Sequence, residues 1–174
     1  MIKFFEKDPY VPIQYVYDVE KVLYKGKSKF QEIMVFENPY FGRILVLDNV
    51  VQLTERDEFI YHEMLTHVVM HAHPEPKTVA VIGGGDGGAV REVLKHTCVK
   101  KLYFVEIDEE VINVSKKFFP SISSAIDDPK VEIKCMDGAE FVKEIENALD
   151  VIIVDSTDII GFARSLFTVE FFKS

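Results

Sequence analysis

The chain has 174 residues, enough for one domain, or for a small domain beside a larger one, with a core that needs no disulfides. It holds 20 Lys and Arg against 29 Asp and Glu, a formal net charge of −9, and 48% of its residues are hydrophobic. This composition is typical of a folded globular protein, and its acidity argues against a general binder of nucleic acid or anionic membrane. The charge is compatible with a small cationic substrate.

Two cysteines, Cys98 and Cys135, give neither a disulfide framework nor a metal cluster, so we expect buried thiols in a reducing, cytoplasmic compartment. The first residues carry charge within a short apolar stretch and do not form a secretory signal. No apolar run approaches the ~18 residues of a membrane helix, so no membrane partner is expected.

From Ile13 to Thr54 the sequence favours strands separated by turns. β-Branched and aromatic runs cover 14–24, 30–37 and 43–47, and Asp48-Asn49 followed by 50–54 predicts a tight hairpin. We predict a small antiparallel β domain over residues 1–54.

A helix is predicted over 57–71, capped by Thr54 or Asp57 and ended by the prolines at 74 and 76. This helix and its linker, residues 55–76, connect the β domain to the second half of the chain.

From residue 77 strands alternate with helices. Strands are predicted at 78–82, 101–106, 131–135 and 150–155, and helices at 87–95, 109–118 and 139–146. This alternation predicts a Rossmann-like, doubly wound α/β domain of the methyltransferase type over 77–174. Residues 165–174 look like the start of a further helix, and such a sheet rarely stops at four strands, so we expect a truncated chain.

Acidic residues follow all four predicted strands, at the edge where open α/β sheets bind ligands. The first strand leads into a glycine loop, with Gly83, Gly85 and Gly88 in the G-x-G-x-x-G pattern, and the second ends in Glu106, near the usual distance for an acid that holds ribose hydroxyls. Together these features predict a nucleoside site.

Asp86 lies within the glycine loop. A carboxylate there would repel the pyrophosphate of a dinucleotide or the carboxylate of S-adenosylmethionine, and it would attract an ammonium group. With Glu106 and Asp137 recognising adenosine, this charge points to decarboxylated S-adenosylmethionine. The alternative is that Asp86 only caps the helix that begins at Gly87.

Asp155 ends the fourth apolar strand, and Asp158 follows three residues later. A carboxylate at the end of a buried strand can have a raised pKa and act as a general base for an amine nucleophile. A second carboxylate could hold the other ammonium of a diamine. The alternative is a pair of helix caps, which the intervening Gly161 makes weaker.

These residues occur in sequence segments that resemble the spermidine synthase (polyamine aminopropyltransferase) family along nearly the whole chain. The resembling segments are 30–31, 42–48, 52–58, 61–65, 83–88, 105–108, 137–138 and 155–158. The resemblance implies a small N-terminal β domain, a Rossmann-like domain, and a homodimer or larger homo-oligomer, for which the N-terminal strands offer exposed edges.

The resemblance also assigns roles to residues. Asp155 would accept the proton, and Asp86 would hold the aminopropyl ammonium. The polyamine path would be lined by Tyr61, His62, Asp155, Ser156, Thr157 and Asp158. The thioadenosine site would comprise Gln31, Gly83, Gly85, Glu106, Asp137 and Gly138. Proline is usual in the family at two positions that here hold Ile159 and Phe162, and Phe162 would either stack on the adenine or reshape its site.

The leading hypothesis is transfer of an aminopropyl group from decarboxylated S-adenosylmethionine to putrescine, giving spermidine and methylthioadenosine, with no prosthetic group. Three alternatives remain: a methyltransferase that uses ordinary S-adenosylmethionine, a non-catalytic nucleoside-binding protein, and a Rossmann oxidoreductase.

The histidines do not predict a metal site. His62 and His67 are one residue too far apart for the zinc-helix motif, and His67 and His71 have the right spacing but no third ligand follows them. We therefore expect no metal.

Overall fold

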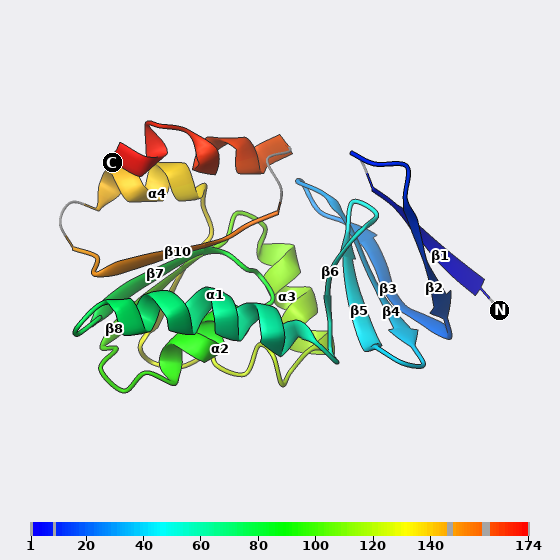
Figure 1. Cartoon of the computed structure of the whole chain (residues 1–174), viewed down its shortest axis with the longest axis horizontal. Helices are drawn as coiled ribbons and strands as arrows, with labels where there is room; N and C mark the ends of the chain where they lie inside the picture. Colours follow the sequence, from blue (N-terminus) through cyan, green and yellow to red (C-terminus); the bar gives the residue numbers. More distant parts are fainter. Residues whose placement is uncertain (1, 9, 146–147, 158–160, 174) are drawn as a thin grey trace. The chain divides into compact units, whose positions relative to one another are not determined.

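In the computed structural model, which describes residues 2–8, 10–145, 148–157 and 161–173, strands fill the first third of the chain and alternate with helices afterwards (Figure 1). The contacts divide the chain into two units, Met1–Phe59 and Ile60–Ser174. The predicted fold class, an N-terminal antiparallel β domain followed by a parallel α/β sheet, is confirmed.

The first unit contains antiparallel strands. Its two sheets are β1 (Ile2–Lys7) with β2 (Gln14–Val19), and, in chain order, β3 (Lys21–Lys27), β4 (Glu32–Asn38), β5 (Gly42–Leu47) and β6 (Val50–Thr54). Phe4 and Val19 from the first sheet pack with Phe36, Ile44 and Val46 from the second, so one apolar cluster joins the two sheets.

Two details of this unit differ from the expectation. The run 14–24 is not continuous: it divides at Glu20 into β2 and β3, which belong to different sheets. Residues 2–7, which carried no assignment, form β1. The hairpin at Asp48-Asn49 is confirmed, since both residues have the left-handed φ (47° and 65°) that a tight type I′ turn requires.

The second unit is built on a parallel sheet with the order β10 (Val151–Asp155), β7 (Thr78–Gly83), β8 (Lys101–Val105), β9 (Val131–Lys134). The chain moves outward from β7 through β8 to β9 and then returns to the other side of β7. Strand order therefore reverses between β7 and β10, and the carboxyl ends of these two strands flank the crevice where such sheets bind ligands.

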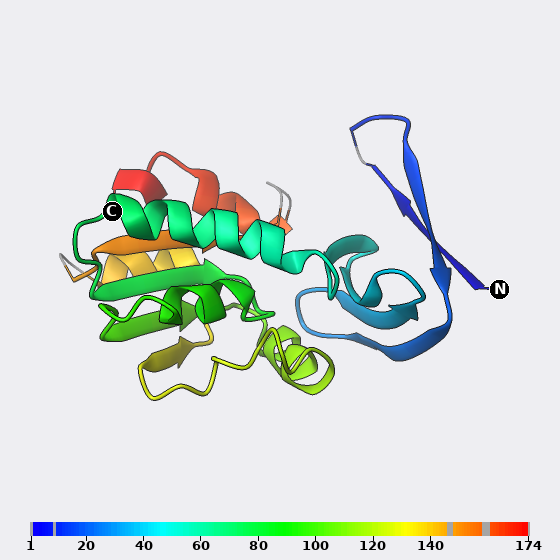
Figure 2. The ribbon, with the colours of Figure 1, turned by 60° about the horizontal axis from the view of Figure 1, so that its bottom comes forward.

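Helices cover both faces of this sheet (Figure 2). One face packs against α1 (Glu58–Ala72), α2 (Gly88–Leu94) and α3 (Glu109–Phe118), through residues such as Met70, Val90 and Ile112. The other face packs against α4 (Gly138–Glu144) and the 3₁₀ segments η1 (Gly161–Phe167) and η2 (Phe171–Lys173), through Phe141 and Leu166. The helix predicted to begin at 165 is thus two short 3₁₀ turns.

Two further observations concern the expected environment. Cys135 is exposed and Cys98 is only half-buried, so the prediction of two buried thiols is wrong. Cys135 directly follows β9, which is the edge strand of the sheet among the described residues. Within the described ranges, every helix is too short or too polar to cross a membrane.

Candidate active site

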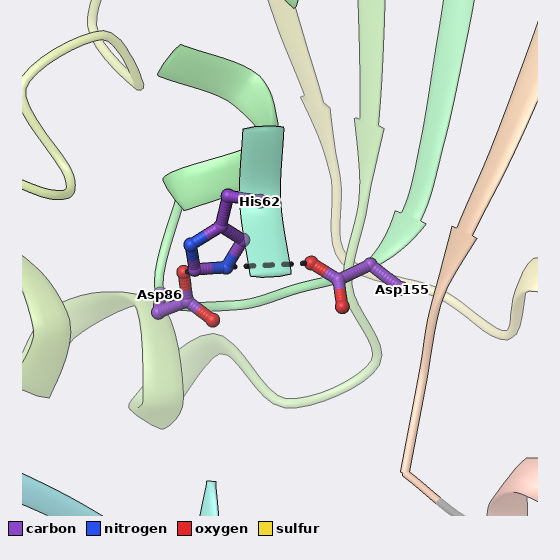
Figure 3. Close-up of side chains that lie close together, drawn as sticks. All are labelled: His62, Asp86 and Asp155. Carbon is purple, nitrogen blue, oxygen red and sulfur yellow. Dashed lines mark ion pairs between the residues drawn. The ribbon is translucent and has the colours of Figure 1, made fainter. Parts of the chain in front are cut away.

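Three charged or titratable side chains meet at the carboxyl ends of β7 and β10 (Figure 3). Asp155 is the last residue of β10, Asp86 lies in the loop between β7 and α2, and His62 comes from the second turn of α1. His62 Nε2 lies 3.2 Å from Asp86 Oδ1 and 3.9 Å from Asp155 Oδ2. The imidazole therefore stands between two carboxylates that the sequence separates by 69 positions (155 − 86).

Tyr61 completes this group. Its hydroxyl donates a hydrogen bond to Asp155 Oδ1 over 2.9 Å. Burial and the negative charge of Asp155 raise the pKa of Tyr61, so its hydroxyl keeps its proton and remains a donor. One oxygen of Asp155 is thereby oriented by α1.

The second oxygen of Asp155 is different. Oδ2 is buried and has no hydrogen-bond partner in the described part of the chain. Burial, and then the negative charge of Asp86, raise the pKa of Asp155 to about 6, while His62 and Tyr61 oppose the rise. A buried acceptor without a donor is costly in a folded protein, and such groups are found where a ligand or a proton is to be received.

The glycine loop makes room for these side chains. A Cβ at Gly84, which has a φ of +66°, would lie 2.4 Å from Asp155 Oδ2, and one at Gly88 would lie 2.3 Å from the ring of His62. At Gly85 it would lie 2.8 Å from Val111 Cγ1 and 3.0 Å from Glu106 Oε2. Glycine is needed here because three functional side chains approach the backbone closely.

Glu106 follows β8, the next strand of the sheet. It is 8% exposed, and its Oε1 accepts the backbone N–H of Asp108 over 2.9 Å. Burial raises the pKa of Glu106 to about 7, with smaller contributions from the charges of Asp108 and Asp86. In its ionised form, a buried carboxylate beside the glycine loop is a good acceptor for hydroxyl groups.

Asp137 and Gly138 follow β9. Asp137 caps α4, with Oδ1 accepting from Ala139 N over 2.7 Å and from Ser165 Oγ over 3.4 Å. A Cβ at Gly138 would lie 2.2 Å from Ile82 Cγ2, so glycine permits close packing of α4 against β7. These contacts give both residues a structural role beside any role in binding.

Asp86 does contact the start of α2, as the capping alternative predicts, but this is not its only contact. Asp86 Oδ1 accepts the N–H of Gly88 over 2.7 Å, which supports the first turn of α2. The same oxygen faces His62, so this carboxylate belongs both to the helix start and to the cluster.

Other predicted site residues lie apart from this group or outside the described ranges. Ser156 and Thr157 follow Asp155 directly, whereas Asp158 and Ile159 lie outside the described residues. Phe162 falls within η1, where its side chain is not described. Gln31 belongs to the first unit, in the turn before β4, so its predicted contact with the nucleoside stays a prediction.

The side chains of His62, Asp86 and Asp155 each offer one ligand atom, and these atoms lie within 4.8 Å of one another. Such a group could surround an ammonium nitrogen or a metal ion, since both are compact cations that prefer oxygen and nitrogen ligands. The hydrogen bond between Tyr61 and Asp155, residues 94 positions apart, has no signal in the sequence, because only the fold brings the two together.

Comparisons with known proteins agree over the whole chain. Residues 58–174 match the family described as "Spermine/spermidine synthase domain", and residues 2–55 match "Spermidine synthase tetramerisation domain". The polyamine aminopropyltransferase of Hydrogenobaculum sp. (strain Y04AAS1) is 58% identical over 172 residues, which are 99% of this chain and 61% of the relative. The spermidine synthase of Schizosaccharomyces pombe is 50% identical over 89% of this chain and 52% of its own length.

Solved structures give the same result. A spermidine synthase in complex with the transition state analogue AdoDATO superposes with a TM-score of 0.97 at 45% identity, over 99% of this chain and 59% of that protein. Spermidine synthase from Thermotoga maritima gives a TM-score of 0.92 at 44% identity, over 99% and 57%. The chain thus spans about three fifths of the length of its relatives. Over that length, sequence and fold agree that it belongs to the spermine/spermidine synthase family.

Proposed function

We propose that this chain carries an aminopropyl-transfer site that takes decarboxylated S-adenosylmethionine and putrescine and forms spermidine and methylthioadenosine. The observation that carries the proposal is the unpartnered, buried Oδ2 of Asp155 beside His62 and Asp86. Relatives at more than 50% identity are named polyamine aminopropyltransferases, which supports the same reaction.

The nucleoside side of the site would use the ends of β8 and β9. Glu106 would accept hydrogen bonds from the ribose hydroxyls, and its burial would strengthen these bonds by keeping water away. Asp137 and Gly138 would contact the adenine, with Phe162 and Gln31 as further contacts. Gly83 and Gly85 would let the ligand approach the backbone of the loop closely.

The amine side would use the cluster at β7 and β10. Asp86 would hold the aminopropyl ammonium, and the path of the diamine would be lined by Tyr61, His62, Ser156, Thr157 and Asp158. Placing two cations here offsets the repulsion between the carboxylates of Asp86 and Asp155. The same two carboxylates disfavour the negative carboxylate of ordinary S-adenosylmethionine, which argues against the methyltransferase alternative.

The reaction would be one in-line displacement. Asp155 Oδ2 takes a proton from the ammonium of the diamine, leaving a nitrogen lone pair. This pair forms a bond to the methylene carbon beside the sulfonium, the carbon–sulfur bond breaks, and its electrons neutralise the sulfur. The pKa of about 6 makes Asp155 a stronger base than an ordinary carboxylate while leaving it largely ionised at neutral pH.

The N-terminal unit would serve assembly. Its match to a tetramerisation domain supports a homo-oligomer. The apolar side chains exposed on β1 and β2 fit this role, since Ile2, Phe5 and Val16 are each more than half exposed.

Product analysis tests the proposal. The chain is incubated with putrescine and either decarboxylated or ordinary S-adenosylmethionine, and the products are identified by mass spectrometry. Spermidine and methylthioadenosine from the decarboxylated ligand support aminopropyl transfer. A methylated diamine from the ordinary ligand would instead establish a methyltransferase, and nucleoside binding without any product would establish a binding protein.

Asp155→Asn probes the proposed base within the same assay. We expect spermidine formation to fall by about 10²–10⁴-fold, the usual loss on removal of a general base. Binding of methylthioadenosine, measured by calorimetry, should stay close to that of the parent chain because Asp155 would not contact it. Near-full turnover by Asp155→Asn at neutral pH would show that another group accepts the proton.

A further inference from the structure

A second cluster of titratable side chains lies farther along α1, separate from the proposed active site. It contains His67 and His71 of α1 and His96, which follows the end of α2. The ring centroids of His96 lie 5.1 Å from His67 and 5.0 Å from His71, and those of His67 and His71 lie 6.2 Å apart. The fold therefore brings a third imidazole to the pair that has helical metal-site spacing.

A buried carboxylate orients one of these rings. Glu92 is fully buried, and its Oε2 lies 3.0 Å from His67 Nε2. Acceptance by Glu92 requires the proton of His67 on Nε2, which leaves the lone pair on Nδ1. That Nδ1 lies 2.9 Å from His96 Nε2. A histidine with one nitrogen bound to a carboxylate and the other presenting a lone pair is the arrangement found at protein metal sites.

We propose that His67 Nδ1, His96 Nε2 and the ring of His71 bind one divalent transition-metal ion, with Zn²⁺ as the matching ion. Two imidazole nitrogens on a tetrahedral zinc ion stand about 3.3 Å apart, so the present 2.9 Å contact has to open by only a few tenths of an ångström. His71 is exposed, and rotation of its side chain brings a third nitrogen to the ion. Water takes the fourth position.

The protonation of the cluster suits a metal. Burial lowers the pKa of His96, and so does the proximity of the His67 and His71 rings. On binding, the proton that His96 Nε2 shares with His67 Nδ1 moves to His96 Nδ1, so that Nε2 presents a lone pair to the ion and the His96 ring stays neutral. Of the neighbouring cations, Arg91 Nε lies 2.9 Å and Lys95 Nζ 2.5 Å from Glu92, so both are paired with that carboxylate.

Titration of the 174-residue chain with Co²⁺ and Zn²⁺ tests the site. Tetrahedral Co²⁺ absorbs strongly in the visible range, so we expect one equivalent to give this spectrum and Zn²⁺ to displace it. His67→Ala, His71→Ala and His96→Ala should each abolish the spectrum. His73→Ala is the matched control, since His73 contacts Glu75 and stands outside the cluster. Glu92→Gln should weaken affinity by about 10–100-fold.

The result must be separated from metal bound at His62, Asp86 and Asp155. Loss of the spectrum in Asp86→Asn, with binding kept in His96→Ala, would assign the ion to that other cluster and overturn the proposal. Binding unchanged in any of the three alanine variants, or no binding at millimolar metal, would overturn it as well.

A measurement on the parent chain covers the case of a variant that fails to fold. The chain has five histidines, and ¹⁵N resonances of their side chains are recorded with and without Zn²⁺. Large shifts confined to His67, His71 and His96 support the site. Shifts at His62, or at none of the five, contradict it.

Discussion

Asp86 places a carboxylate in the glycine loop, where it contacts Gly88 and His62. Its Oδ1 accepts the N–H of Gly88 and faces His62 Nε2, and Asp155 Oδ2 lies 3.9 Å from the same nitrogen. The carboxylates of Asp86 and Asp155 thus lie together beside His62, while Glu106, the proposed ribose ligand, lies beside Gly85. We expect the charge of Asp86 to discriminate between ligands that differ by one carboxylate.

Asp86→Asn should narrow the preference for decarboxylated over ordinary S-adenosylmethionine. The amide removes the repulsion of the ligand carboxylate, which is about 1 kcal/mol at ~4 Å in water and larger in a cleft of lower dielectric. It keeps an oxygen for the N–H of Gly88, so α2 should begin at the same residue. Calorimetric affinities of both ligands for both proteins give the ratio. An unchanged ratio would show that Asp86 acts only on the helix.

The burial of Glu106, which we propose to bind the ribose, makes the stability of the fold depend on pH. The ordinary pKa of 4.5 applies in the unfolded chain, and burial raises the pKa to about 7 in the folded one. Between these values the folded chain binds more protons than the unfolded chain, so the contribution of Glu106 to stability falls as pH rises from about 4.5 to about 7. Above this window the buried charge destabilises the fold.

Glu106→Gln should therefore raise the free energy of unfolding above about pH 7, by up to about 3 kcal/mol, and the gain should vanish below about pH 4.5. The glutamine oxygen can still accept from Asp108 N. Urea unfolding of parent and variant across this range gives the difference, with exposed Glu63→Gln as the control. A gain of equal size at both ends of the range would contradict the assignment to the charge. Methylthioadenosine affinity should fall in the same variant.

At the scale of elements, the loop between β7 and α2 determines how near the side chains of the site can lie to the backbone. Gly84 is the clearest case, because its φ is +66° and an added Cβ would lie only 2.4 Å from Asp155 Oδ2. The loop therefore constrains the position of the proposed base, Asp155, through Gly84, and it also carries Asp86.

Gly84→Ala should lower the rate of spermidine formation, and it should also lower the thermal stability of the chain. The added methyl displaces Asp155 from its place, and about 1 Å of misplacement can cost about 10²-fold in rate. Gly26→Ala is the control, since its Cβ would meet only the far end of the Tyr24 side chain. Product assay and thermal unfolding are compared for both variants. Full activity of Gly84→Ala would show that the loop moves freely.

Elements with a clear local pattern could be predicted from the sequence. The apolar strand β7 and helix α3, whose cap Asp108 accepts the N–H of Glu110, lie where their residues predict them. The division at Glu20 could not be predicted, because strand-forming residues continue on both sides and only pairing assigns them to two sheets.

The same distinction holds within the site. Glu106 and Asp86 could be singled out because they lie in or near a motif of fixed spacing. The contact of Tyr61 with Asp155 and that of His67 with His96 could not, because they depend on packing between residues 94 and 29 positions apart.

At the scale of the whole molecule, the strands that carry Glu106 and Asp155 differ in how many neighbouring strands hold them. Glu106 follows β8, which has neighbours on both sides, whereas Asp155 ends β10, which stands at the edge of the described sheet. About two fifths of the length of these relatives lies outside the part that this chain matches. Within the described sheet, the strand that carries Asp155 is therefore held by a neighbouring strand on one side only.

We expect the 174-residue chain to bind methylthioadenosine better than it turns over putrescine, relative to a full-length family member. We expect Asp155, at the end of the edge strand β10, to be held less firmly than Glu106, and loose placement of reacting atoms lowers the rate more than it lowers nucleoside affinity. The Hydrogenobaculum relative is the comparison, with affinity from calorimetry and turnover from product formation. Equal turnover by both proteins would show that this length of chain suffices for catalysis.

The position of β10 beside β7 also has a consequence for how the molecule folds. Strands β7, β8 and β9 can pair in the order in which they are synthesised. Strand β10 follows β9 in the chain but pairs with the opposite edge of β7, which closes a loop of about seventy residues. Contacts between distant segments form slowly because the entropy of loop closure is lost before they are gained. Asp155 joins His62 and Asp86 only in that step, so the appearance of catalytic activity would report the last pairing event of the sheet, and chains stalled before it would be largely folded yet inert.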